Sequence, residues 1–133
     1  MPITFSIYEE RGFFVSSWVD AISDSDLLSS YMQLFENEQY KPGFHEIADM
    51  RNAQMVGVTS EGMYRLASMA KDHLAGNCES FKTAVIAPED LAFGLSRIYA
   101  AFGYKSPENV MVFKEPDKAF KWIGADSSVL KMI

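Results

Sequence analysis

Apolar residues occur along this chain in two patterns that alternate: short continuous runs, and residues spaced three or four positions apart. Runs rich in β-branched and aromatic residues predict five strands, at 3–8, 13–19, 44–50, 81–87 and 109–113. Gly12 lies in the polar segment between the first two runs, which is typical of an antiparallel hairpin. The run at 81–87 is apolar almost throughout, as expected of a central parallel strand that is covered on both faces.

Four segments have apolar residues three or four positions apart, which predicts amphipathic helices. They extend from Ser23 to before Pro42, over 61–75, from Pro88 to about Phe102, and over 117–123. Ser23 is a candidate N-cap for the first helix, because acidic residues follow it. Thr59 or Ser60 suits the start of the second helix.

The order of these elements predicts an α/β fold with a five-stranded, mostly parallel sheet, an N-terminal antiparallel hairpin and about four helices. Strands that alternate with helices imply right-handed crossovers and therefore parallel neighbours. The length of 133 residues fits one hydrophobic core, and we expect a single domain over 1–124. The tail at 125–133 is apolar, and we expect it to pack on its own domain or on a neighbour.

Charge and cysteine content narrow the classes of partner and compartment. The net charge is −6 and the basic residues are scattered, whereas nucleic-acid binding needs clustered cations. Cys78 is the one cysteine, which excludes an internal disulfide and fits a reducing compartment. The N-terminus lacks a secretory pattern, and every apolar stretch is shorter than the roughly 18 residues of a membrane span. We therefore expect a cytoplasmic protein with no nucleic-acid partner and at most peripheral membrane contact.

Several stretches of the chain resemble a known fold family. The order of elements is similar to that of STAS domains, which include anti-sigma-factor antagonists such as SpoIIAA. Four stretches look more specifically like the bacterial SpoIIAA-like proteins, namely KPGFHEIADMR (41–51), TSEGMYRLA (59–67), AVIAPEDLAFGLSRIY (84–99) and SPENVMVFKEPDKAFKWI (106–123). That family is also described as close to the CRAL-TRIO lipid-carrier fold. The resemblance implies a STAS fold and a lipid-like ligand, and none of the four stretches contains a catalytic signature.

The resemblance also suggests a phosphorylation site at the start of the second helix. In the phosphorylated STAS antagonists this helix begins at a D-S-S-G motif, whose first serine accepts phosphate. Alignment on Gly62 places Thr59, Ser60 and Glu61 on the three preceding positions. Ser60, or Thr59 beside it, is then the candidate phosphoacceptor. Glu61 opposes an incoming phosphate by charge repulsion, and the alternative is that Thr59 or Ser60 only caps the helix.

The strand ends offer little catalytic chemistry. Ligands favour the crevice beyond the carboxyl ends of parallel strands, where Asp49 and Arg51 either pair with each other or receive a polar head group. His45 and His73 have no third ligand at recognisable spacing, so we expect no metal. Cys78 follows a helix end, where the dipole raises the pKa of a thiol and argues against a nucleophile. We expect no cofactor and no enzymatic activity.

The third helix carries more apolar surface than one buried face requires. One stripe runs through Leu91, Leu95, Ile98 and Phe102 and is interrupted by Ser96 and Arg97, and Phe93 adds apolar area beyond it. The excess predicts a second contact, with a lipid-like ligand, a protein partner, a second copy of the chain or a membrane; alternatively, Phe93 packs on the neighbouring helix. The candidate ligand-binding residues are Asp49, Arg51, Met63, Phe93 and Arg97. We expect a non-enzymatic binding domain, and a phospho-regulated partner switch is the alternative.

Overall fold

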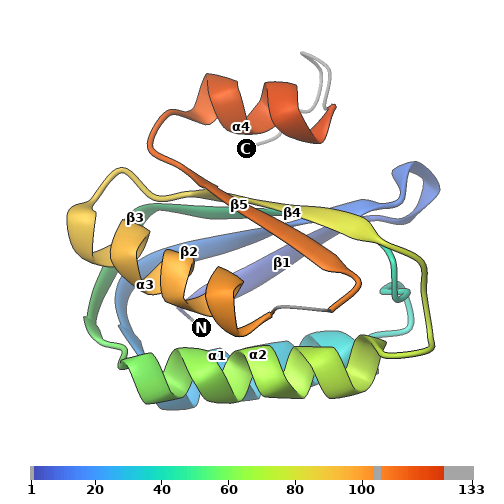
Figure 1. Ribbon diagram of the computed structural model, residues 1–133, viewed down its shortest axis with the longest axis horizontal. Helices are drawn as coiled ribbons and strands as arrows, with labels where there is room; N and C mark the ends of the chain where they lie inside the picture. The colour runs from blue at the N-terminus through green and yellow to red at the C-terminus, as the bar shows by residue number, and fades with distance from the viewer. Residues whose placement is uncertain (1, 104–105, 125–133) are drawn as a thin grey trace.

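The computed structural model describes residues 2–103 and 106–124, and the predicted order of strands and helices is confirmed there (Figure 1). The strands are β1 (Ile3–Tyr8), β2 (Phe13–Ser23), β3 (His45–Gly57), β4 (Phe81–Ile86) and β5 (Glu108–Phe113). The helices are α1 (Asp24–Glu36), α2 (Ser60–Leu74), α3 (Asp90–Phe102) and α4 (Pro116–Ile123). A 3-10 turn (Glu9–Arg11) joins β1 to β2, and Gly12 ends it with a positive φ of 68°. The apolar tail predicted at 125–133 lies outside the described residues.

The five strands form one sheet in the order β1-β2-β3-β4-β5. β1 pairs with β2 in antiparallel orientation, and the other neighbours are parallel. Each parallel connection steps to the next strand in the same direction, so right-handed crossovers place α1, α2 and α3 on one face of the sheet. Figure 1 shows α4 on the opposite face.

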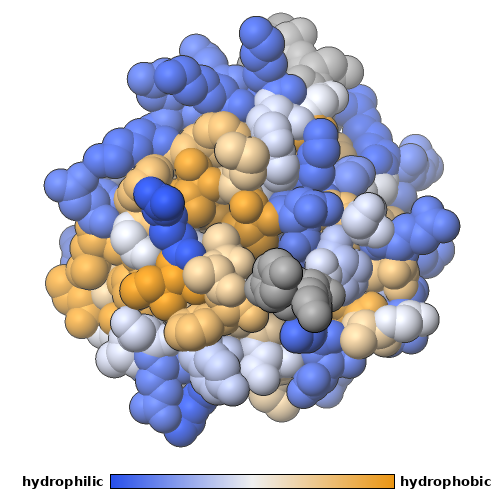
Figure 2. All heavy atoms as spheres, in the orientation of Figure 1, coloured by the Kyte–Doolittle hydropathy of each residue, from blue (hydrophilic) through white to orange (hydrophobic). Residues whose placement is uncertain are grey.

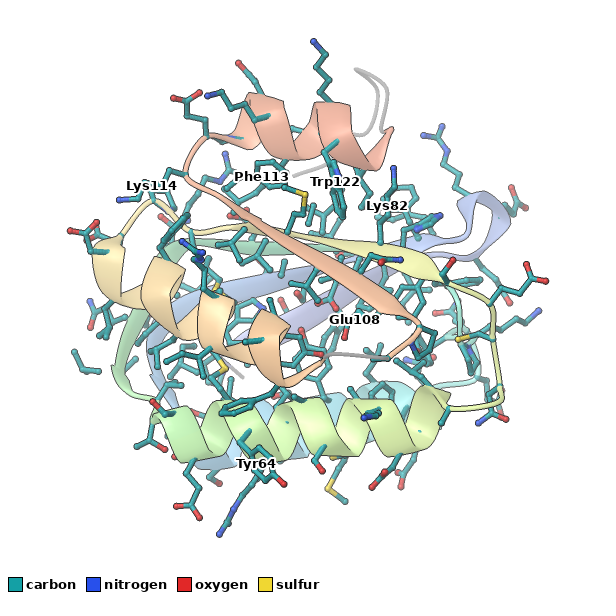
Figure 3. The ribbon with its side chains drawn as sticks, viewed as in Figure 1. Tyr64, Lys82, Glu108, Phe113, Lys114 and Trp122 are labelled. Carbon is teal, nitrogen blue, oxygen red and sulfur yellow. The ribbon has the colours of Figure 1, made fainter. Side chains whose placement is uncertain are left out.

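Helix α4 is held on its face of the sheet by a lysine from β4. The ammonium nitrogen of Lys82 donates a hydrogen bond of 2.9 Å to the backbone oxygen of Trp122. The same nitrogen lies 5.1 Å from the centre of the Trp122 ring, and Figure 3 shows the two side chains together beneath α4. Phe120 of α4 is buried in a small apolar cluster with Val15 and Ile47. The short helix therefore covers a core of its own.

Strands β2 and β3 extend further than the sequence predicted. The predicted end of the third strand at Met50 and the loop around Asn52 are wrong, because β3 continues to Gly57 and pairs with β2 as far as Ser23. Pairing between β3 and β4 ends at Asp49. The extension is exposed at Asn52, Gln54 and Val56 and buried at Ala53 and Met55, so it lacks the continuous apolar run from which the strand was predicted.

The first helix begins where its capping residues predict. The Ser23 hydroxyl accepts a hydrogen bond from the backbone N–H of Asp26 at 3.2 Å, and the Asp26 carboxylate accepts from the backbone N–H of Ser23 at 2.9 Å. This reciprocal capping box satisfies two groups that a helix N-terminus otherwise leaves without partners. Leu27 follows at once and is completely buried, so the cap also sets the face that α1 presents to the sheet.

Helix α3 buries only the middle of the apolar stripe that its sequence pattern indicated, namely Leu95 and, in part, Ile98. Leu91 and Phe102, at the two ends of the predicted stripe, are 50% and 44% exposed. The buried residues of α3 are Ala92, Leu95 and Ser96. Burial of Ser96 is tolerated because its hydroxyl donates a 3.4 Å hydrogen bond to the sulfur of Met50. The buried face is therefore shifted toward Ala92 and Ser96, and the two ends of the stripe reach the surface.

Candidate functional site

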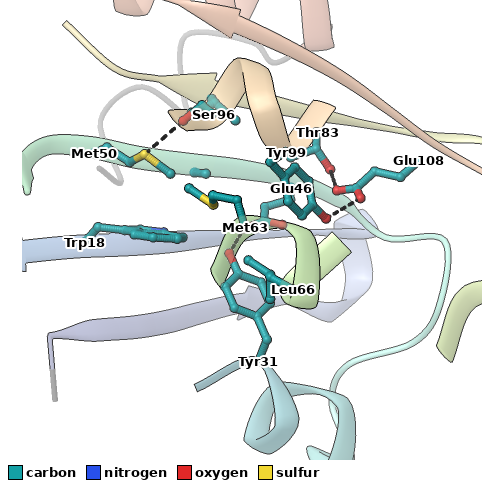
Figure 4. Close-up of a pocket in the computed structure, with 12 residues that line it drawn as sticks. Trp18, Tyr31, Glu46, Met50, Met63, Leu66, Thr83, Ser96, Tyr99 and Glu108 are labelled. Atoms are coloured by element: carbon teal, nitrogen blue, oxygen red, sulfur yellow. Dashed lines mark hydrogen bonds between the residues drawn. The ribbon is translucent and has the colours of Figure 1, made fainter. Parts of the chain in front are cut away.

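A small, largely apolar cavity with two carboxyl groups in its wall lies between the sheet and the three helices that cover it (Figure 4). Its free volume is about 30 Å³, which is room for about two water molecules. Strands β2 to β5 form its floor, and α1, α2 and α3 supply Tyr31, Met63 and Tyr99. Met63, predicted to contact a ligand, is 1% exposed and lines this cavity. A second hollow of about 20 Å³ adjoins the same two tyrosines.

Glu46 of β3 is the first of two carboxyl groups in the wall of this cavity. One of its oxygens accepts hydrogen bonds from the hydroxyls of Ser16 at 2.6 Å and Tyr31 at 2.5 Å. The indole N–H of Trp18 donates to the Ser16 oxygen at 3.0 Å. These groups come from β2, β3 and α1, so a polar chain crosses the apolar core and joins three elements.

Glu108 of β5 is the second carboxyl group, and its contacts mirror those of the first. One oxygen accepts a 2.6 Å hydrogen bond from the Thr83 hydroxyl of β4, and the other accepts a 2.6 Å bond from the Tyr99 hydroxyl of α3. Neither Glu108 nor Glu46 forms an ion pair with any residue that the structure describes. Among the described residues, the hydrogen bonds to the two carboxyl groups come from hydroxyls.

Burial without a cation changes the acidity of both carboxyls. It raises the pKa of Glu46 to about 7, and the nearby carboxyl of Glu108 adds to this effect, while the hydroxyls of Ser16 and Tyr31 oppose it. Burial also raises the pKa of Glu108, against hydrogen bonds from Thr83 and Tyr99. Glu46 therefore exchanges a proton near neutral pH, in a space that admits only water-sized molecules.

A larger hollow lies on the surface between α3 and the outer edge of the sheet, and we call it the α3–β5 groove. Its volume is about 480 Å³, and it is lined by Phe93, Arg97, Ala100, Ala101, Val110, Met111 and Val112. Figure 2 shows apolar side chains gathered over α3, with hydrophilic ones among them. Phe93 and Arg97, which the sequence singled out, therefore share one groove, and Phe93 faces β5 in this groove.

Two cations flank the aromatic ring in the α3–β5 groove. The guanidinium carbon of Arg97 lies 6.0 Å from the centre of the Phe93 ring, and the ammonium nitrogen of Lys114 lies 5.2 Å from it. Lys114 also forms a 2.6 Å ion pair with Asp90, and Figure 3 shows it just beyond the end of β5. Arg97 has no carboxylate partner among the described residues.

The predicted pair at the strand ends, Asp49 and Arg51, is present, and the two side chains bond to each other. Arg51 donates two side-chain hydrogen bonds to the carboxylate of Asp49, at 2.9 and 2.8 Å. This fork-shaped contact raises the pKa of Arg51, although burial opposes it. Arg51 also lines an open surface hollow of about 430 Å³ with Glu89 and Leu91. The pair is therefore separate from both the internal cavity and the α3–β5 groove.

The candidate phosphoacceptors lie at the exposed start of α2. The Thr59 hydroxyl accepts from the backbone N–H of Gly62 at 3.0 Å and donates to the Asp24 carboxylate at 2.6 Å, so it caps the helix. Gly62 lies so close to that carboxylate that a side chain at this position would displace it. Ser60 is exposed and follows the cap directly. A phosphate on Ser60 would meet the charges of Asp24 and Glu61.

The two histidines contact neighbouring residues of the fold, and the cysteine is partly buried. The imidazole nitrogen Nδ1 of His45 accepts a 2.9 Å hydrogen bond from the backbone N–H of Lys82, and the His73 ring stacks on Phe35 with 4.1 Å between centroids. Burial raises the pKa of the Cys78 thiol, in the direction expected from its position after a helix. Within the described part of the chain, no three His, Cys, Asp or Glu side chains are grouped to hold a metal, and no helix is long and apolar enough to cross a membrane.

The sequence did not single out the two buried acids. Glu46 and Glu108 stood among the many acidic residues of the chain, although Glu46 lies in the run at 44–50 and Glu108 directly precedes the run at 109–113. A carboxylate at an inward position of such a run is the one local signal that could have identified them. The five predicted ligand-binding residues lie in three places: Met63 in the cavity, Phe93 and Arg97 in the α3–β5 groove, and Asp49 with Arg51 at the strand end.

Comparison with known proteins identifies the fold. No family model and no curated protein matches the sequence. The structure is similar to the crystal structure of an uncharacterized protein of the DUF3478 family, with a SpoIIAA-like fold, from Shewanella loihica PV-4. The TM-score is 0.56 over 91% of each chain, at 13% sequence identity. The chain therefore has a SpoIIAA-like fold, as its resemblance to that family predicted.

Proposed function

We propose that this chain is a non-enzymatic interaction domain that binds a segment of a partner protein along the α3–β5 groove. The observation that carries the proposal is a hollow of about 480 Å³, lined by six apolar residues and Arg97, beside a strand that pairs on one side only within the described sheet. Exposed strand edges next to apolar grooves are favourable places for another chain to bind. A reducing, cytoplasmic setting suits the single cysteine, Cys78.

The sizes of the hollows favour a polypeptide over an enclosed lipid-like ligand. Pockets that enclose a small molecule usually have volumes of about 300–1,000 Å³. The two cavities beside the buried acids have volumes of about 30 and 20 Å³, and their walls are partly polar. The α3–β5 groove is larger but open, which suits a partner that also covers the surrounding surface.

The chemistry of the groove supports binding and not catalysis. Its lining consists of aliphatic and aromatic side chains and one guanidinium. A nucleophile needs a neighbouring base to be activated, and the described lining contains neither group. Glu46 can exchange a proton near neutral pH, but its cavity holds only water-sized molecules.

Peptide selection tests the proposal directly. A displayed library of random peptides about ten residues long, the upper range of a strand, is selected against the full chain. Ala101→Arg then fills the α3–β5 groove from an exposed position of α3. Gln33→Arg is the matched control, because it adds the same side chain at an exposed position of α1. We expect peptides that lose at least about tenfold in affinity for the first variant and less than about twofold for the second.

Two outcomes would contradict the proposal. One is a selection that yields no peptide above the background of an unrelated protein. The other is a set of peptides that bind A101R and the parent chain equally well. Fatty acid or phospholipid that co-purifies with the chain and is lost from A101R would instead support the lipid-like alternative.

A further inference from the structure

We infer that the partner segment adds to the sheet as a sixth strand beside β5 and places an acidic side chain over Arg97. The inference rests on the proposed function and names the binding mode and the chemistry of the partner. It depends on three features: the direction of the free backbone groups of β5, the small residues of α3 opposite them, and a cation without a carboxylate partner.

The backbone of β5 presents alternate groups to the open side. The carbonyl of Pro107 accepts from the backbone N–H of Phe81, and the carbonyl of Phe113 accepts from that of Ala87. Successive residues of a strand direct their backbone groups to opposite sides. The N–H and C=O groups of Val110 and Val112 therefore point away from β4, and no strand among the described residues pairs with them. They are the hydrogen-bonding partners that an added strand needs.

The side of α3 that faces this edge leaves room for another side chain. Phe93, Arg97, Ala100 and Ala101 follow one another at helical spacing along the groove. Lys114, directly after β5, contacts the Phe93 ring, so Phe93 lies near the carboxyl end of β5 and the alanines lie nearer its start. An added strand would direct every second side chain into this row. The alanines accept a large apolar residue, and Phe93 provides an aromatic surface.

Charge complementarity selects an acidic partner residue. Arg97 is exposed, contacts the Phe93 ring, and has no carboxylate partner among the residues described. Lys114, on the other side of the ring, is already paired with Asp90. A carboxylate beside Arg97 would form a charge-assisted hydrogen bond at the rim of an apolar groove. The partner segment should therefore alternate apolar residues on its groove side with one Asp or Glu.

A partner protein fits this site better than a second copy of the chain. The chain carries a net charge of −6, so two copies repel each other at neutral pH and low ionic strength. In a two-fold dimer through β5, both Arg97 side chains would lie near the same interface. A groove with one arginine that has no carboxylate partner among the described residues, on an acidic protein, is better matched by an extended segment of a different chain that carries an Asp or Glu.

Backbone methylation of a selected peptide tests the strand geometry. A methyl group on a backbone nitrogen removes one donor, and only alternate donors of an added strand face β5. Single methylation along the peptide should therefore lower affinity at least about tenfold at every second position and less than about threefold between them. On binding, the amides of Val110 and Val112 should become protected from hydrogen exchange.

A double-mutant cycle tests the interaction between Arg97 and the acidic residue of the partner. Arg97→Gln should weaken a peptide that carries Glu by about two- to fivefold. It should leave the Gln version of the same peptide within about 1.5-fold, because the interaction needs both charges. Arg65→Gln, at an exposed position of α2, is the control and should change the affinity of neither peptide.

The results separate the inference from the proposed function. Peptides that need the open groove but show no alternation under methylation would overturn strand addition and leave the function standing. Selected peptides without acidic residues, or equal losses for the Glu and Gln versions, would overturn the role of Arg97. Failure to select any peptide overturns both. A dimer of the free chain that dissociates in Ala101→Arg would identify a second copy as the occupant.

Discussion

Glu46 makes the stability of this domain depend on pH in an unusual direction. Burial raises the pKa of Glu46 from 4.5 to about 7, so the folded chain holds this proton more tightly than the unfolded chain. The stabilisation is complete below about pH 4.5 and is lost as the pH rises through about 7. A shift of this size corresponds to about 3 kcal/mol, since one pKa unit is worth about 1.4 kcal/mol.

Glu46→Gln removes the titration and keeps the shape of the side chain. The amide oxygen can still accept the hydrogen bonds of Ser16 and Tyr31, and the amide stays neutral at every pH. E46Q should therefore equal the parent chain near pH 4.5 and exceed its stability by up to about 3 kcal/mol at about pH 8. Glu108 also has a raised pKa, so some dependence of the same sign should remain in E46Q.

Urea unfolding followed by tryptophan fluorescence measures this difference at several pH values. Urea is uncharged and leaves the electrostatic term intact, and Trp18 is buried beside the acid network. Glu38→Gln, an exposed residue, is the matched control and should keep the slope of the parent chain. An E46Q chain whose free energy of unfolding follows the parent curve from about pH 5 to about pH 8 would refute the reasoning.

Three further substitutions test the packing. Ser23→Ala removes the capping box of α1 and should lower the free energy of unfolding by about 1 kcal/mol, whereas Ser25→Ala, on the exposed face of the same turn, should change it by less than about 0.5 kcal/mol in chemical denaturation. Leu95→Ala should lower the free energy of unfolding by about 2–5 kcal/mol and Leu91→Ala by less than about 1 kcal/mol. Equal losses would mean that both leucines of the predicted stripe are buried against the core. Gly62→Ala should cost about 1–2 kcal/mol in the same assay, because the new methyl group displaces the carboxylate that holds the cap of α2.

The local pattern of residues was sufficient to predict the elements and their order. The hairpin, the alternation of helices and strands and the cap at Ser23 depend on neighbours within a few positions, where side-chain periodicity and backbone preferences act directly. The resemblance of four stretches to SpoIIAA-like proteins added the correct fold. Prediction was less accurate where β3 passes Met50, because exposed strand residues need no apolar run.

The candidate sites depended on contacts between distant parts of the chain. Glu46 meets Tyr31 and Glu108 meets Tyr99 only after β3, β5 and two helices pack together, and an acid in a strand gives no sign of such a partner. The face that α3 buries was decided in the same way, by packing against the sheet, where Ser96 contacts Met50.

The sequence by itself therefore determined which segments become strands and helices and the fold they build. The tertiary structure decided which side chains are buried, which acids are shielded from water, and which strand edge has no neighbour among the described residues. The physical reason is that periodicity is a property of neighbouring residues, whereas desolvation and edge pairing depend on what packs against them from elsewhere in the chain.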